Sequence, residues 1–161
     1  MNTHIAILTF DGFNELDSLI ALALGSGVRT REIATDSSIM AALQLDPARQ
    51  LIGAQCSGTL LLAKLGLLGN GPACTDLTTR PWVIEAGVKV LNQPFHATGN
   101  VATAGGCLAA QYLAAWIIAR TAGLSDAKSA LQYVAPVGEK DEYVERAMRH
   151  VAPFVTSARV A

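Results

Sequence analysis

The sequence has little charge, few aromatic side chains and only three cysteines among its 161 residues. Because the formal net charge is −1, no excess of one sign draws the chain toward nucleic acid or anionic lipid. Cys56, Cys74 and Cys107 are too widely spaced to suggest a disulfide framework or a zinc site, so we expect neither a metal nor a cofactor. This cysteine usage is typical of a reduced, cytoplasmic protein.

Long hydrophobic runs are also missing. The longest uncharged apolar stretch, 107–119, is too short to span a bilayer, and we expect it to form a buried helix. The first residues have no basic segment followed by a long apolar run, so no leader is expected. About half of the residues are apolar, which predicts a single domain over 1–161 with a sizeable core.

A pattern of strand, glycine turn and helix occurs three times along the chain. Short apolar runs end in small or glycine-rich turns, and apolar residues at helical spacing follow each turn. The three units cover 20–45, 51–68 and 100–123, and one further strand is expected at 4–10. Repeated units of this kind predict an α/β fold with a mostly parallel sheet flanked by helices. Further helices are expected at 125–133, with Ser125 as N-cap, and at 141–151, whereas 82–91 fits a helix or a strand.

The stretch QLIGAQCSGTLLLAKLGLL, residues 50–68, contains the clearest functional signal. It places Cys56 where an apolar strand turns into a helix, with the small residues Ala54 and Gly58 on either side. A sharp strand-to-helix turn requires such small neighbours and exposes its central side chain as a nucleophile. The first turn of the helix favours the thiolate. A buried structural cysteine would need none of this context, which Cys74 and Cys107 lack.

Two other features belong at the same edge of the predicted sheet. The turn at Gly25 and Ser26 follows a strand, and the amides of Ser26 and Ser57 could stabilise a developing negative charge. Asp17 and Glu15 follow the first strand, and either carboxyl could exchange a proton with a nearby thiolate. The spacing alone does not choose between these two acids.

The motifs IAILTFDGFNELD, ALGSGVRTRE, LIGAQCSGTLLLAKLGLL and GNVATAGGCLAAQYLAAW, taken in this order, resemble the ThiJ/PfpI (DJ-one) superfamily. The resemblance runs through most of the chain and implies a flavodoxin-like three-layer sandwich of the class I glutamine amidotransferase type. It also implies that Cys56 is the nucleophile and that Asp17, rather than Glu15, is the carboxyl beside it. Ser57 falls where isonitrile hydratase-type members have a threonine. The resemblance further implies a homodimer.

The sequence departs from the superfamily pattern at two places. Asp76 stands where many relatives have a histidine, so no Cys-His dyad is evident and Asp76 is at most an auxiliary group. His96 is expected on the surface. Only seven residues separate Asp17 from Gly25, where relatives have a helix and two strands, about fifty residues. This internal segment is either truly deleted, in which case a partner chain must cover the exposed sheet edge, or present in the protein and missing only from the 161 residues of this sequence.

These observations favour a cysteine-dependent hydratase or hydrolase that acts on a small electrophilic substrate, with an isonitrile hydratase-like arrangement of Cys56 and Asp17. One alternative is a redox sensor in which Cys56 itself is oxidised. A third hypothesis is a binding domain without catalysis, in which the Cys56 thiol is unreactive.

Overall fold

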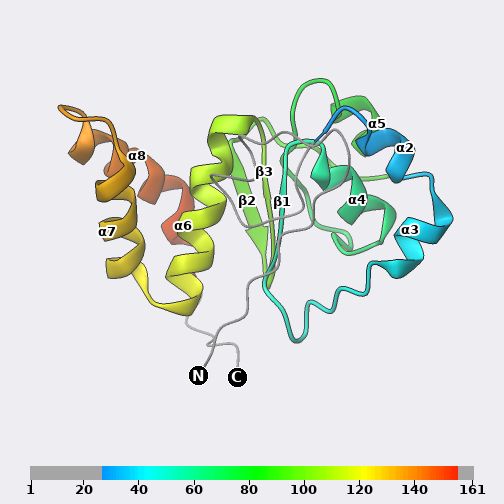
Figure 1. The fold of residues 1–161 in the computed structure, drawn as a ribbon, viewed down its shortest axis with the longest axis horizontal. Coiled ribbons are helices and arrows are strands. Elements are labelled where there is room, and N and C mark those ends of the chain that lie inside the picture. The colour runs from blue at the N-terminus through cyan, green and yellow to red at the C-terminus, as the bar shows by residue number, and fades with distance from the viewer. Residues whose placement is uncertain (1–26, 156–161) are drawn as a thin grey trace.

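The computed structural model describes residues 27–155, in which short strands alternate with helices along the chain (Figure 1). The strands are β1 (Ile52–Gln55), β2 (Phe95–Thr98) and β3 (Val101–Ala104). The helices are α2 (Thr30–Ile33), α3 (Ser37–Ala42), α4 (Gly58–Lys64), α5 (Arg80–Glu85), α6 (Ala110–Thr121), α7 (Leu124–Val134) and α8 (Lys140–Val151), with short 3-10 turns at Cys107–Ala109 and Ala152–Phe154.

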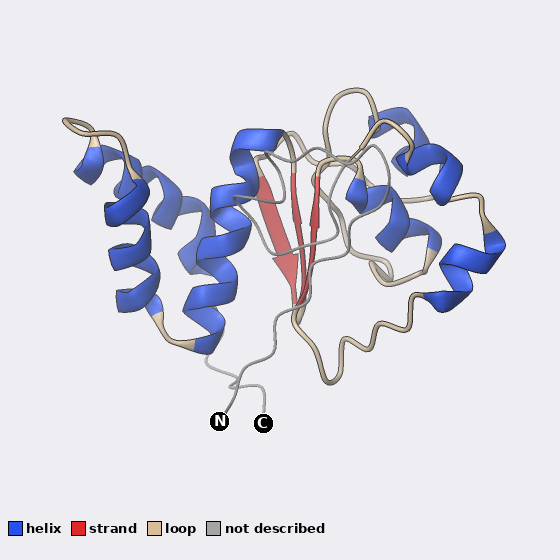
Figure 2. Cartoon of the chain, in the orientation of Figure 1, coloured by secondary structure: helices blue, strands red, loops and turns tan. Residues whose placement is uncertain are grey.

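The described strands form one sheet in the order β1-β3-β2 (Figure 2). β1 and β3 are parallel, with Gln55 opposite Ala104, as the repeated strand-glycine-helix units predict. β2 runs antiparallel to β3, and the sequence analysis did not anticipate it. The four-residue segment follows Pro94 and includes the partly exposed His96, so it lacks the continuous apolar run that marked the other strands.

Helices cover both faces of the sheet, which gives the predicted three-layer α/β architecture. In Figure 1, α6, α7 and α8 lie on one side of the strands, and α2 to α5 lie on the other. The two sides have separate hydrophobic clusters. Successive residues of β3 alternate between them, because Val101 belongs to the cluster with α4 whereas Ala102 and Ala104 belong to the cluster with α6. The 4–10 and 20–24 strands lie outside the described residues.

The helical pattern predicted over 30–45 is split into two short helices, α2 and α3. The hydroxyl of Thr35 donates back to the carbonyl of Glu32 at 2.7 Å and thereby competes with continuation of the helix. Asp36 then acts as the N-cap of α3, because its carboxylate accepts hydrogen bonds from the amides of Ser38 and Ile39. The apolar periodicity therefore predicts helical structure in this segment correctly, but the side chains of Thr35 and Asp36 divide the expected helix into two.

The C-terminal helices agree with the sequence analysis except at their ends. The helix expected at 107–123 begins as a 3-10 turn and ends at Thr121, before Gly123, whose φ of 115° is left-handed. Gly123, rather than Ser125, is the N-cap of α7, so the predicted serine cap is wrong. α8 begins at Lys140, within one residue of the predicted start.

The C-terminal end of α6 is fastened to the turn between β2 and β3. The guanidinium group of Arg120 donates to the carbonyl of Gly99 at 2.8 Å and to Oδ1 of Asn100 at 2.6 Å. The same group lies over the ring of Trp116, 5.3 Å from its centroid. Across residues 27–155, no helix has the length and apolar character needed to cross a membrane.

Candidate active site

Cys56 lies on a strained strand-to-helix elbow between β1 and α4. Its φ is +48°, and it is the only non-glycine residue of the described chain with a positive φ. A side chain in this region of φ and ψ crowds the backbone, and such strain is concentrated at functional sites. Ala54 and Gly58, the small neighbours identified from the sequence, are both buried. The structure therefore contains the predicted elbow.

Hydrogen bonds to its backbone hold the elbow in this conformation. The amide of Cys56 donates to the carbonyl of Ala104 at the end of β3, at 2.8 Å. The carbonyl of Cys56 accepts from the hydroxyl of Thr75 at 2.8 Å and from the amide of Thr59 at 3.3 Å. Contacts from three separate segments thus offset the cost of the left-handed backbone.

Ser57 connects the elbow to the glycine turn near the start of the described chain. Its hydroxyl lies 2.9 Å from Oγ1 of Thr30 and accepts from the amide of Gly27 at 3.3 Å. Ser57 is almost completely buried, so these contacts also satisfy a polar group that has lost its water. Gly25 and Ser26 lie outside the described residues, as does Asp17. The structure nevertheless brings Gly27, the last residue of that turn, to the elbow.

Cys107 lies beside Cys56, which the sequence analysis missed. The two Sγ atoms are 3.8 Å apart, and Cys107 is partly exposed whereas Cys56 is 3% exposed. The side-chain amide of Gln55 donates to the carbonyl of Gly106 at 2.6 Å and reaches Sγ of Cys56 at 3.4 Å. The sequence contains a signal for this proximity, because each of these cysteines follows a predicted strand. When two such strands are parallel neighbours, the residues that follow them lie at the same edge of the sheet.

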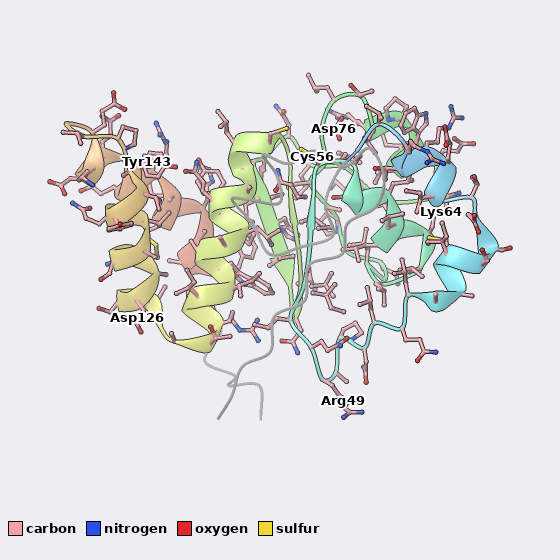
Figure 3. The ribbon with its side chains drawn as sticks, in the orientation of Figure 1. Arg49, Cys56, Lys64, Asp76, Asp126 and Tyr143 are labelled. Atoms are coloured by element: carbon pink, nitrogen blue, oxygen red, sulfur yellow. The ribbon has the colours of Figure 1, made fainter. Side chains whose placement is uncertain are left out.

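Asp76 lies in the loop that contacts the elbow (Figure 3). Its Oδ1 accepts hydrogen bonds from the amides of Thr78 and Thr79, at 2.9 and 3.0 Å, so this oxygen orders the turn before α5. Its Oδ2 is buried and has no hydrogen-bond partner within the described residues. The sequence analysis left open whether this acid assists Cys56, and a buried carboxylate oxygen without a partner is compatible with such a role.

Two other residues considered in the sequence analysis lie away from this chemistry. The Cys74 side chain is buried, and burial raises the pKa of its thiol to about 12, which keeps it protonated at neutral pH. The ring of His96, on β2, contacts Oγ1 of Thr98 at 3.2 Å and the ring of Phe154 at a centroid distance of 5.0 Å. These contacts do not bring His96 to Cys56.

Comparison with known proteins identifies the fold. No protein-family model matches the sequence, and no curated protein matches it either. Similar solved structures include a ThiJ/PfpI family protein from Pseudomonas syringae, with a TM-score of 0.60 at 20% identity over 80% of this chain. A ThiJ/PfpI domain protein from Brachyspira murdochii gives 0.53 at 14% identity over 63% of this chain. This chain spans 60% and 57% of the lengths of those two proteins. It therefore has the ThiJ/PfpI fold.

Proposed function

We propose that the chain is a ThiJ/PfpI-type enzyme that uses Cys56 as a nucleophile to hydrate or hydrolyse a small electrophilic substrate, with isonitriles as the first class to test. The strained elbow at Cys56 carries this proposal. A φ of +48° at a non-glycine residue is costly, and two hydrogen bonds maintain it: the Thr75 hydroxyl donates to the Cys56 carbonyl, and the Cys56 amide donates to the Ala104 carbonyl. Presentation of the thiol explains why the fold retains this conformation.

In the proposed mechanism, the thiolate of Cys56 adds to the electrophilic carbon of the substrate. Asp17 donates a proton to this adduct, which for an isonitrile is taken up by the same carbon, and the amides of Ser26 and Ser57 stabilise the negative charge that develops on the adduct. Water then adds to the same carbon, and the bond to sulfur breaks to regenerate the thiolate. The contact between Gly27 and Ser57 supports this arrangement, because it brings the end of the glycine turn to the elbow.

A Cys56→Ser variant tests the proposal. We expect turnover of a small aliphatic isonitrile to its formamide to fall by about a thousandfold or more, because a serine hydroxyl is a far weaker nucleophile without a general base. Cys107→Ser is the matched control, since no step is assigned to Cys107, and it should retain turnover. Circular dichroism of both variants checks that they fold. Undiminished turnover by Cys56→Ser would sink the proposal.

A redox role for Cys56 is the second candidate, and the sulfur of Cys107 at 3.8 Å favours it. In this case Cys56 reacts with an oxidant rather than with an organic substrate. The two roles are compatible, because both require a reactive, deprotonated sulfur at Cys56.

A further inference from the structure

We propose that Cys107 is a resolving cysteine, which closes onto peroxide-oxidised Cys56 to form a reversible intramolecular disulfide. This inference rests on the proposed function only in requiring a reactive thiolate at Cys56. It adds a role for a residue to which the mechanism assigns no step. Formation of the disulfide would switch the nucleophile off, and reduction would restore it.

The sulfur atoms of the two cysteines are already in contact. Their separation of 3.8 Å exceeds a disulfide bond length by less than about 2 Å. Cys56 comes directly after β1 and Cys107 comes three residues after the end of β3, and the two strands are parallel neighbours whose register pairs Gln55 with Ala104. Because both backbones leave the sheet at the same edge, side-chain rotation with a small adjustment of the turn can bring the sulfurs together.

Gln55 acts as a positioning residue for this pair. Its side-chain amide bridges β1 to the turn that carries Cys107, through the carbonyls of Gly106 at 2.6 Å and Cys107 at 3.3 Å. Gln55 itself is 1% exposed, so water does not compete for these contacts. The turn is thereby held against the elbow, and the Cys107 thiol stays close to Cys56.

The chemistry is a two-step oxidation that consumes one peroxide. The Cys56 thiolate attacks the peroxide O–O bond, which gives Cys56 sulfenic acid and releases the other oxygen as an alcohol or water. The Cys107 sulfur then attacks the sulfenic sulfur, and the hydroxyl leaves as water with the proton of the Cys107 thiol. The two cysteine sulfurs together lose two electrons, and the peroxide accepts them.

Cys74 serves as an internal reference, because burial disfavours its thiolate form. Its side chain is 0% exposed, and burial raises its pKa to about 12. A thiol that remains protonated and inaccessible reacts slowly with peroxide. The structure thus predicts selective oxidation of two cysteines out of three.

The experiment treats the full-length chain with a small excess of hydrogen peroxide and maps its cysteines without reduction. Trypsin places Cys56, Cys74 and Cys107 on separate peptides, 50–64, 65–89 and 90–120, because the bond between Arg80 and Pro81 resists cleavage. We expect peptides 50–64 and 90–120 to appear as one linked species, lighter by two hydrogen atoms than their sum. Dithiothreitol should separate them.

The Cys107→Ser variant provides the decisive comparison. Without a resolving thiol, peptide 50–64 should carry one or two added oxygen atoms, and no linked species should form. If wild-type Cys56 instead accumulates sulfinic acid as fast as in Cys107→Ser, the inference is wrong. The isonitrile assay on the reduced proteins separates this failure from failure of the proposed function. Normal turnover with no disulfide overturns only the inference, whereas a disulfide without turnover overturns only the enzymatic proposal.

Discussion

The three thiols of the chain have three different environments. Cys56 is held on the elbow, Cys107 is partly exposed beside it, and Cys74 is enclosed between α4 and β3. The amide of Cys74 donates to Oγ1 of Thr103, and its carbonyl accepts from the hydroxyl of Thr59, so its backbone joins these two elements. The sequence patterns favour a structural role for both Cys74 and Cys107, and the structure buries Cys74 but places the sulfur of Cys107 next to that of Cys56.

Alkylation should distinguish Cys74 from the other two thiols. With a pKa of about 12, only about one Cys74 side chain in ten thousand is a thiolate at pH 8. We expect iodoacetamide to leave peptide 65–89 unmodified in the native protein and to modify it in 6 M guanidinium, in which burial is lost. Rapid labelling of Cys74 under native conditions would show that the core around it opens. Peptide 90–120, which contains the partly exposed Cys107, should be labelled in both cases.

At the scale of elements, the loop before α5 and the turn after β3 support the elbow together. Gly105 follows β3, and a Cβ atom built there would lie 2.7 Å from the backbone oxygen of Thr75. Thr75 in turn donates to the carbonyl of Cys56. The close approach of these two backbones therefore requires a glycine at position 105. A shift of the Thr75 backbone would also move the hydroxyl that is hydrogen-bonded to Cys56.

Gly105→Ala should destabilise the protein by about 1–3 kcal/mol, because a backbone atom obstructs the new methyl group. It should also lower turnover at Cys56 through displacement of Thr75. Gly53→Ala is the control, since its Cβ would meet only the side chain of Leu113, at 2.9 Å, and a side chain can rotate away more cheaply. Urea denaturation and the isonitrile assay provide the two measurements. Equal losses of stability and activity in both variants would contradict a specific role for the Gly105 contact.

The elements that could be predicted from the sequence are those with a clear apolar run or helical periodicity. The elbow, β1, β3, α6 and α8 all have such patterns, and all are present. β2 was missed because the partly exposed His96 interrupts its apolar residues. The break between α2 and α3 depends on the hydrogen bond that the Thr35 hydroxyl donates and on those that the Asp36 carboxylate accepts, neither of which is visible in the periodicity of the apolar residues. Proximity of Cys56 and Cys107 required the pairing of β1 with β3, which is tertiary information.

At the scale of the whole molecule, stability should depend on pH through His96. Burial lowers the pKa of His96 below its ordinary value of 6.5. The unfolded chain therefore binds more protons than the folded chain below about pH 6.5, and the free energy of unfolding falls as the pH is lowered toward the folded pKa. Below that pKa, His96 contributes no further change.

Urea denaturation at pH 8.0 and pH 5.5 tests this dependence. The wild-type protein should lose stability at the lower pH, and His96→Gln should lose less, because glutamine does not titrate. An identical pH dependence in both proteins would show that another group is responsible.

Part of the proposed site remains a prediction from the sequence. Asp17, Gly25 and Ser26 fall outside residues 27–155, and so does the short connection between Asp17 and Gly25. The resemblance assigns those residues their roles, whereas the structure supports the elbow, Ser57 and the contact with Gly27. The homodimer also remains a prediction, which sedimentation velocity can measure.

The way in which α6 is anchored at both ends limits how the two sulfurs can move. A helix of 12 residues is about 18 Å long, whereas a four-residue strand spans about 13 Å, so α6 extends the full length of β3. Cys107 lies just before its first turn, and Arg120 fastens its last turn to Gly99 and Asn100. The helix therefore links the two ends of the strands and keeps them at a fixed separation. If α6 shifted along its axis when the disulfide formed, the hydrogen bonds from Arg120 to Gly99 and Asn100 would break. We therefore expect the two sulfurs to meet by local rotation near Cys107 rather than by movement of the helix.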